Sequence, residues 1–246
     1  MLALKVNTLQ KSYHDDIVLR GIDLQIEQGE SFGFAGANGA GKSTMLNCLL
    51  NFCYYEVGEI RLFGVSCKNH LARERIAFLP ERFIPPYYLT GEQFLRMMMK
   101  LRGVDYSPAR AEEMLAALDL HGSAMKKPVR SFSKGMTQKL GLAACFLSER
   151  DFYILDEPMS GLDPKSRVLV KRQFKVLGER GATLFFTSHM LADIDEICSD
   201  MAVLHGGKIR YRGAPSGMRQ AFSDADTLEE AYLRAISDDE DNAHPS

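Results

Sequence analysis

Residues 36–44 constrain the fold of this chain more than any other stretch. They fit the pattern Gly-x-x-x-x-Gly-Lys-[Ser/Thr] at every position. In such a loop the glycines let backbone N–H groups turn inward on a phosphate, the lysine supplies positive charge to the β and γ oxygens, and the serine offers a hydroxyl to Mg²⁺. The residues expected to bind nucleotide here are Gly36, Asn38, Gly39, Ala40, Gly41, Lys42, Ser43 and Thr44.

The segments on both sides of this loop have the patterns that it requires. Residues 31–35 form a short apolar run, typical of a buried strand. Residues 43–52 predict a helix with Leu46, Leu49 and Leu50 on one face. Strand, loop and helix in this order indicate a nucleotide-binding α/β domain rather than a merely glycine-rich turn.

Composition limits the class of protein. The 246 residues are 46% hydrophobic and 25% charged, which is ordinary for one or two globular domains, and the net charge of −2 gives no reason to expect a nucleic-acid partner. The five cysteines contain no Cys-x-x-Cys pair and predict small core residues in a reducing compartment. The chain starts with a strand-like alternation instead of a leader, and no apolar run reaches the roughly 18 residues of a membrane span. We therefore expect a cytosolic chain.

The remaining patterns predict an α/β fold with three parts. Alternation over 22–27 and again over 59–63 predicts an antiparallel β flank, and 76–79 predicts a buried strand. Helices follow, with Thr90 and Gln93 as a capping box and Phe94, Leu95, Met98 and Leu101 as one apolar face. Strands at 152–155, 182–186 and 201–204 then alternate with helix and predict a mainly parallel sheet, and 213–215 is expected to close the folded part. The helical block is an insertion into the nucleotide core.

Two acidic residues after the 152–155 strand complete the chemistry. A buried strand delivers Asp156 to the carboxyl edge of the sheet, where it can reach a metal ion, and Glu157 can act as general base for an attacking water. No Asn-Lys-x-Asp sequence occurs, which disfavours a GTPase.

These motifs, in this order, resemble those of the ATP-binding subunit of an ABC transporter over nearly the full length of the chain. Tyr13 matches the aromatic residue that stacks on adenine, Glu81 the Q-loop glutamine, residues 131–138 the signature Leu-Ser-Gly-Gly-Gln, Asp163 the D-loop, and His189 the H-loop histidine. The resemblance implies a P-loop NTPase (RecA-like) core at 1–82 and 150–215 and a helical subdomain at 83–149, together an ABC ATPase domain over 1–217. A short helix and an acidic, disordered tail would follow at 218–246.

The resemblance also assigns roles to the site residues. Lys42, Glu157 and His189 would be catalytic, and Ser43, Asp156 and Glu81 would hold Mg²⁺. ATP bound by one chain would contact Ser133, Lys134 and Gly135 of a second chain in a head-to-tail dimer. Ser133 can also cap a helix running toward Ser148, which would aim that helix N-terminus at a phosphate.

Two departures from the family pattern stand out. Glu81 replaces a neutral amide with a carboxylate, and Lys134 and Thr137 replace a glycine and the final glutamine of the signature. We expect Lys134 to point to solvent. Because the base, the lysine and the histidine remain, ATP hydrolysis is still expected. Variants of this kind, and the ending at 227–233, are similar to the exporter branch with ABC-2 type membrane partners.

The expected function is that of an ATP-hydrolysing subunit, on the inner face of the membrane, which drives export through a separate membrane subunit. The apolar segment 82–89 is the expected docking site for that subunit, although the same residues could instead cover the core of the helical block. The alternative function is a soluble ABC ATPase for protein or cofactor assembly.

Overall fold

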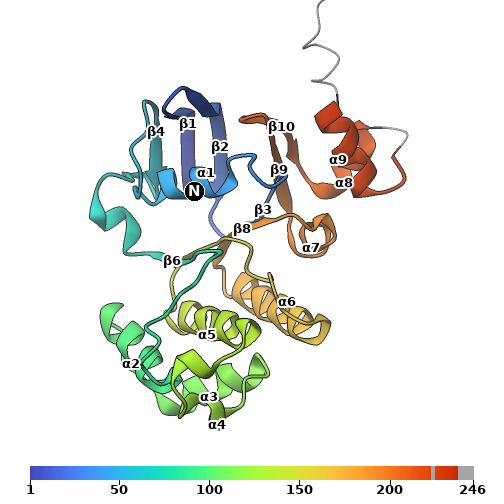
Figure 1. Cartoon of the computed structure of the whole chain (residues 1–246). Coiled ribbons are helices and arrows are strands. Elements are labelled where there is room, and N and C mark those ends of the chain that lie inside the picture. Colours follow the sequence, from blue (N-terminus) through green and yellow to red (C-terminus); the bar gives the residue numbers. More distant parts are fainter. Residues whose placement is uncertain (223–224, 238–246) are drawn as a thin grey trace, which may run out of the picture. The chain divides into compact units, whose positions relative to one another are not determined.

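The computed structural model describes residues 1–222 and 225–237 (Figure 1). The acidic stretch 238–241, for which the sequence predicts disorder, lies outside the described residues. The chain divides into two compact units. The first unit comprises residues 1–74 and the described residues from 183 onward, and the second unit comprises residues 75–182.

The first unit contains an antiparallel sheet in the order β2-β1-β4-β5. Its strands are β1 (Leu2–Tyr13), β2 (Asp16–Glu27), β4 (Val57–Leu62) and β5 (Val65–Ser66). In β2, Ile22, Leu24 and Ile26 are buried while the residues between them are exposed, because successive side chains of a strand point to opposite faces. This is the antiparallel flank that the alternation predicted.

The same unit contains the strand that leads into the glycine-rich loop. Strand β3 (Ser31–Ala35) lies between β8 (Thr183–Ser188) and β9 (Asp200–His205) and is parallel to both. Strand β10 (Lys208–Gly213) pairs with β9 as a hairpin closed by Gly206 and Gly207, whose φ angles of 55° and 76° suit a two-residue turn. In the core beneath, the rings of Phe32 and Phe34 make edge contacts with Phe185 at centroid distances of 5.8 and 5.6 Å.

Four helices of the first unit flank these strands. They are α1 (Lys42–Leu49), α7 (Leu191–Ile197), α8 (Pro215–Ala221) and α9 (Leu228–Ser237), and a short 3₁₀ turn covers His70–Arg73. The expectation that residues 213–215 close the folded part is wrong. Helices α8 and α9 follow and lie side by side (Figure 1). Met218 of α8 and Ala231 of α9 are fully buried. The two helices bury apolar side chains. The sequence pattern of a short terminal stretch could not show which other element those side chains would contact.

The second unit contains two parallel strands and a set of helices. Strands β6 (Ile76–Leu79) and β7 (Phe152–Leu155) pair in register from end to end. The helices are α2 (Gly91–Leu101), α3 (Pro108–Ala117), α4 (Gly122–Met125), α5 (Lys134–Leu147) and α6 (Pro164–Glu179), with a 3₁₀ turn at Val129–Ser131. Both bonds of the capping box at Thr90 and Gln93 are present, which confirms that prediction.

One predicted core position of α2 is wrong and another is only partly buried. Leu101 is 72% exposed and Met98 is half-buried, whereas Met99 is buried. The buried stripe runs through Gly91, Phe94, Leu95 and Met99, and Leu101 in the last turn lies to one side of it. The carbonyl of Ile76 accepts a hydrogen bond from the Arg102 guanidinium at 2.9 Å, so a polar side chain occupies the place next to the strand.

In the part of the chain that the structure describes, no helix combines the length and the apolar character needed to cross a membrane.

Candidate nucleotide-binding site

The glycine-rich loop joins β3 to α1 and has the backbone conformation of a phosphate-binding loop. Gly39 and Gly41 have φ angles of +82° and +107°, which side-chain-bearing residues rarely adopt. At Gly36 a Cβ atom would stand 2.7 Å from the carbonyl oxygen of Leu204, so only glycine fits between β9 and the loop. Gly41 is the N-cap of α1, and its carbonyl accepts from Met45 at 2.8 Å. The N-terminus of α1, with its outward N–H groups, therefore faces the loop interior.

Lys42 is folded back over the loop. Its side chain is 7% exposed, and its ammonium donates to the carbonyl oxygens of Gly36 and Ala37 at 2.7 and 3.3 Å. Ser43 beside it is exposed in the first turn of α1. The loop thus holds the Lys42 ammonium against its own backbone and exposes the Ser43 hydroxyl at its end. These are the groups that a bound triphosphate and its metal ion need.

His189 lies beside the start of the loop. Strand β8 is parallel to β3, with Ser188 opposite Ala35 at their ends. The residues that directly follow the two strands, His189 and Gly36, therefore lie at the same edge of the sheet. Both line a hollow of about 510 Å³. Its lining residues are Gly36, Ala37, Ser188, His189, Met190, Leu191, Ala192, Glu229, Tyr232 and Leu233.

Tyr13 ends β1 and is 43% exposed. The Lys11 ammonium lies 4.5 Å from the centroid of its ring, on one face. Burial is the main cause that raises the pKa of Tyr13, and a contact with Cys53 adds to it. The neutral ring presents an aromatic surface, as stacking on a base requires, and its role with adenine stays a prediction.

The second unit brings together the carboxylates expected near the metal. Asp156 and Glu157 follow β7, and Glu81 follows β6, so all three lie at the carboxyl edge of a parallel pair. Asp156 and Glu157 are 5% and 8% exposed, and the Asp156 amide donates to the Leu79 carbonyl at 2.8 Å. Glu157 has a φ angle of +48°, in the left-handed region that costs about 1 kcal/mol or more for such a residue.

The signature segment forms the start of α5. Ser133 is the N-cap, and its hydroxyl accepts from the Met136 amide at 3.2 Å, which confirms the predicted cap. The helix ends at Leu147, with Ser148 as its C-cap. Gly135 is half-buried, and a Cβ there would make only an ordinary contact with the Gly161 carbonyl oxygen, at 3.4 Å.

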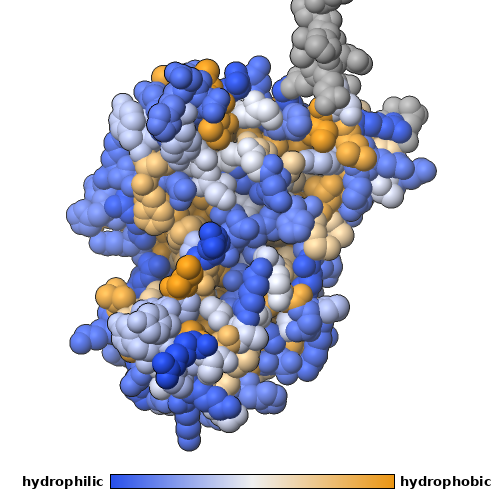
Figure 2. Space-filling model, in the orientation of Figure 1, coloured by the Kyte–Doolittle hydropathy of each residue, from blue (hydrophilic) through white to orange (hydrophobic). Residues whose placement is uncertain are grey.

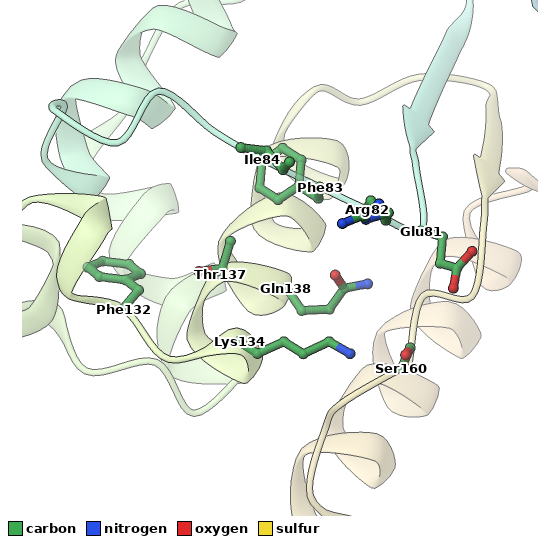
Figure 3. A pocket seen from close by; sticks show the side chains of 9 residues that line it. All are labelled: Glu81, Arg82, Phe83, Ile84, Phe132, Lys134, Thr137, Gln138 and Ser160. Carbon is green, nitrogen blue, oxygen red and sulfur yellow. The ribbon is translucent and has the colours of Figure 1, made fainter.

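Lys134 has a more specific position than the sequence could give. The residue is exposed, as expected, but its methylene chain lies against Gly161, where an added Cβ would be 2.9 Å from Lys134 Cε. Figure 3 shows the side chain extending from the start of α5 toward Ser160. One turn along, Gln138 is buried and donates to the Pro158 carbonyl at 2.9 Å. The residues after Glu157 are therefore tied to the signature helix.

Asp163 is the N-cap of α6. Its carboxylate accepts from the Ser166 amide at 2.9 Å and from the Ser166 hydroxyl, and these bonds hold the pKa of Asp163 below its usual value. This local bonding explains the residue type at a helix start, and its role at a subunit interface stays a prediction.

A second pocket, of about 540 Å³, lies where residues 81–84 approach α5 (Figure 3). It is lined by Glu81, Arg82, Phe83, Ile84, Phe132, Lys134, Thr137, Gln138 and Ser160. The apolar segment behind it is divided between two environments. Phe83 packs edge-on against Phe94 at 5.7 Å, whereas Ile84, Tyr87 and Tyr88 are 81%, 67% and 69% exposed.

The structure thus arranges the expected residues in two sets. The loop and His189 share a sheet edge in the first unit, and the three carboxylates share one in the second. The donors assigned to Mg²⁺ are a hydroxyl and carboxylates, the hard oxygen ligands that this ion prefers. Among the described residues, no group of three histidine, cysteine or acidic side chains could hold a metal by itself. The set fits Mg²⁺ carried by phosphates, which needs only one or two protein carboxylates.

Sequence reasoning missed the contribution of α9 to this region. Glu229, Tyr232 and Leu233 line the same hollow as His189. The amphipathic pattern of 228–233 identified a helix, but periodicity gives no information about which distant surface that helix covers.

Comparisons with known proteins agree with this arrangement. A family model described as "ABC transporter" matches residues 19–160. An uncharacterised ABC transporter ATP-binding protein of Synechocystis is 37% identical over 80% of this chain, which spans 56% of that protein. The Nod factor export ATP-binding protein I of Burkholderia pseudomallei is 32% identical over 90% of the chain and 74% of its own length.

A solved structure of the ATP-binding subunit of an ABC transporter has a TM-score of 0.86 and 28% identity, covering 95% of this chain and 99% of that one. Its fold is the P-loop α/β fold predicted from the sequence. The chain therefore belongs to the ABC transporter family, among its ATP-binding proteins.

Proposed function

We propose that this chain binds and hydrolyses ATP as one of two ATPase subunits that drive export through a separate membrane subunit. The observation that carries the proposal is the β3–loop–α1 segment, with Lys42 over the loop and His189 emerging beside it. The name of the Nod factor relative supports the direction of transport. The chain would lie on the inner face of the membrane, held there by its partner.

The residues of one chain divide the work on ATP. The loop amides and Lys42 bind the phosphates, and Tyr13 stacks on the adenine. Mg²⁺, held by Ser43 and Asp156 with Glu81 nearby, would offset negative charge on the phosphate oxygens. Glu157 accepts the proton of the attacking water, and His189 orients the γ-phosphate for cleavage.

A second copy completes each site. The N-terminus of α5, with Ser133 and Gly135, would face the phosphates bound by the partner chain, since helix amides and dipole favour an anion there. Asp163 would lie at the same interface. Nucleotide that binds the closed pair better than the open pair shifts the equilibrium toward closure, and hydrolysis reverses it.

The membrane subunit would dock at the pocket of residues 81–84. The exposed side chains of Ile84, Tyr87 and Tyr88 beside this pocket supply an apolar surface for an amphipathic helix. Because Glu81 lines the same pocket, docking and the chemistry at the carboxylates would be mechanically connected.

The chemistry is tested by Glu157→Gln, which keeps the shape of the side chain and removes its basicity. We expect ATP hydrolysis to fall by a factor on the order of 10² or more and the variant to elute as a dimer with Mg-ATP in size-exclusion chromatography. A variant that stays monomeric while the wild type hydrolyses freely would contradict the shared site.

The partner is tested by affinity purification from gently solubilised membranes. We expect a multi-span protein to copurify in stoichiometric amount with the wild type and with Leu71→Asp, which changes an exposed apolar residue of the first unit. Ile84→Asp should lose it. Recovery of the wild type from the cytosol alone, with soluble partners, would instead support an assembly ATPase.

A further inference from the structure

Two cysteines lie in contact at the end of helix α1. Cys48 is in the last turn of that helix and Cys53 follows it, and their Sγ atoms are 3.5 Å apart. Both are free thiols, Cys48 buried and Cys53 half-buried, while the other three cysteines are buried. Cys53 is therefore an exception to the prediction that the cysteines are core residues. Two thiols in contact, one of them accessible, are the arrangement from which a disulfide can form.

The backbone turn after α1 brings the two cysteines together. The Phe52 amide donates to the Asn47 carbonyl at 2.8 Å, and the Asn51 amide donates to the Cys48 carbonyl at 3.1 Å. With Asn51 at a φ angle of +57°, these bonds form a Schellman motif, which ends the helix and reverses the chain. The local bonds fix the direction of the chain after α1 and so place Cys53 back against Cys48.

The turn lies at the surface, whereas the helix before it is packed into the core. Asn51 and Phe52 are exposed, and Figure 2 shows hydrophobic surface where the chain leaves α1 toward β4. A small oxidant can therefore reach the half-buried thiol of Cys53. Formation of a disulfide requires the two sulfurs to approach each other by about 1.5 Å. Because Cys48 is fully buried in its helix, most of this movement would fall on Cys53.

The protonation of Cys48 suits a reaction that starts at Cys53. Burial raises the pKa of Cys48, the contact with Cys53 adds to the rise, and the Lys11 ammonium opposes it. Cys48 therefore stays a protonated thiol, which can donate to the sulfur of Cys53. Oxidants react with the thiolate of an accessible cysteine, so Cys53 would react first and Cys48 second.

The reaction with hydrogen peroxide takes two steps. The Cys53 thiolate attacks one peroxide oxygen, so that an S–O bond forms and the O–O bond breaks, and the leaving hydroxide takes up a proton to become water. The Cys48 sulfur then attacks the sulfenic acid at Cys53, so that the S–S bond forms and the S–O bond breaks. The departing hydroxide takes the proton of Cys48 and is a strong enough base for a thiol of raised pKa. In total, two thiols lose two electrons and two protons, and one peroxide becomes two waters.

The segment from Cys53 to Glu56 is joined to the end of β1. The Glu56 carboxylate accepts from the Lys11 ammonium at 3.1 Å and from the Ser12 amide at 2.9 Å. The same ammonium lies over the ring of Tyr13, at 4.5 Å from its centroid. Movement of this segment would therefore be passed to the strand end that carries the aromatic ring proposed to stack on adenine.

We propose that Cys48 and Cys53 are a redox modification site, which a peroxide converts to an intramolecular disulfide and a dithiol restores. Such a bond agrees with a reducing compartment, where disulfides are usually transient. The disulfide would draw Cys53 toward α1 and displace the ring of Tyr13, so the oxidised chain binds ATP more weakly. This second part rests on the ATP-binding function proposed above.

The test is mass spectrometry of tryptic peptides after the whole chain is treated with hydrogen peroxide and its remaining thiols are alkylated under denaturing conditions. Residues 43–61 form one tryptic peptide that contains both cysteines. We expect this peptide to escape alkylation and to be lighter by two hydrogen atoms, and to take two alkyl groups after reduction with dithiothreitol. In Cys53→Ser, Cys48 should be alkylated. The matched control is Cys198→Ser, which removes a buried cysteine after α7 and should form the disulfide as the wild type does.

The consequence for the nucleotide is measured with a fluorescent ATP analogue. We expect the Kd of the wild type to rise by at least about 3-fold on oxidation, part of the affinity that one base-stacking contact supplies, and to return with dithiothreitol. Peroxide should leave the Kd of Cys53→Ser unchanged.

The inference is overturned if the 43–61 peptide of the treated wild type carries two alkyl groups, or if either cysteine pairs elsewhere. It is also overturned if the disulfide forms and the Kd stays the same. A wild type that binds no ATP would refute the proposed function instead. The peptide masses, which need no nucleotide, would still decide whether the disulfide forms.

Discussion

Gly141 in the middle of α5 should not tolerate a methyl group. A Cβ there would stand 2.7 Å from Leu79 Cδ1 and 2.8 and 2.9 Å from two ring carbons of Phe83. Ordinary contacts begin near 3.4 Å. The ring of Phe83 is packed edge-on against Phe94 and Leu79 is 1% exposed, so neither can retreat freely. Overpacking of this kind costs about 1–3 kcal/mol, while replacing a helical glycine by alanine returns about 0.5–1 kcal/mol.

Gly141→Ala should therefore destabilise the second unit by up to about 2.5 kcal/mol. Each kcal/mol lowers Tm by roughly 2–4 °C for a chain of this size. The matched control is Gly178→Ala in α6, where no atom lies within 4 Å of the added Cβ. That variant should be more stable than the wild type by about 0.5–1 kcal/mol. Thermal unfolding followed by circular dichroism distinguishes the expected decrease in Tm of Gly141→Ala from the expected increase in Tm of Gly178→Ala. A Tm of Gly141→Ala equal to or above that of Gly178→Ala would refute the packing argument.

Two further predictions concern helix starts. Thr90→Ala should lower the free energy of unfolding by about 1 kcal/mol, because it removes the hydroxyl that accepts from the Gln93 amide, whereas Thr90→Ser should retain most of that stability in the same calorimetric measurement. The Ser166 bonds depress the pKa of Asp163, so their stabilisation is full above the usual aspartate pKa and is lost as pH falls through the depressed value. Ser166→Ala should raise that pKa in a carboxyl NMR titration, and an unchanged pKa would contradict the assignment.

Local signals in the sequence predicted the local structure well. The strands at 31–35 and 152–155 have the predicted bounds, and the caps at Thr90 and Ser133 form the predicted bonds, because each depends on side chains within a few residues of the backbone they satisfy. Leu101 shows the limit of the same reasoning, since periodicity defines a face but tertiary contacts decide how far along the helix that face stays buried.

The candidate site shows the same difference between local signals and tertiary contacts. The phosphate-binding role of residues 36–44 could be predicted because its chemistry is contained in nine consecutive positions. The place of Tyr232 in the hollow beside that loop could not, because it depends on how α9 packs against α7 and α8. The apolar segment 82–89 needed the structure for another reason. Composition describes the segment as a whole, and only coordinates separate half-buried Phe83, packed against Phe94, from exposed Ile84.

The way Lys42 is held has a consequence for the energetics of nucleotide release. A buried ammonium without hydrogen-bond acceptors destabilises a protein by about 3–5 kcal/mol. If Lys42 lost its acceptors on phosphate release, this cost would slow the release of the anion. The carbonyl oxygens of Gly36 and Ala37 already accept this ammonium within its own loop. When a phosphate departs, the Lys42 ammonium would therefore exchange phosphate oxygens for these carbonyl oxygens. The positive charge of the ammonium would stay compensated throughout. Such a loop can bind tightly without making product release the slow step.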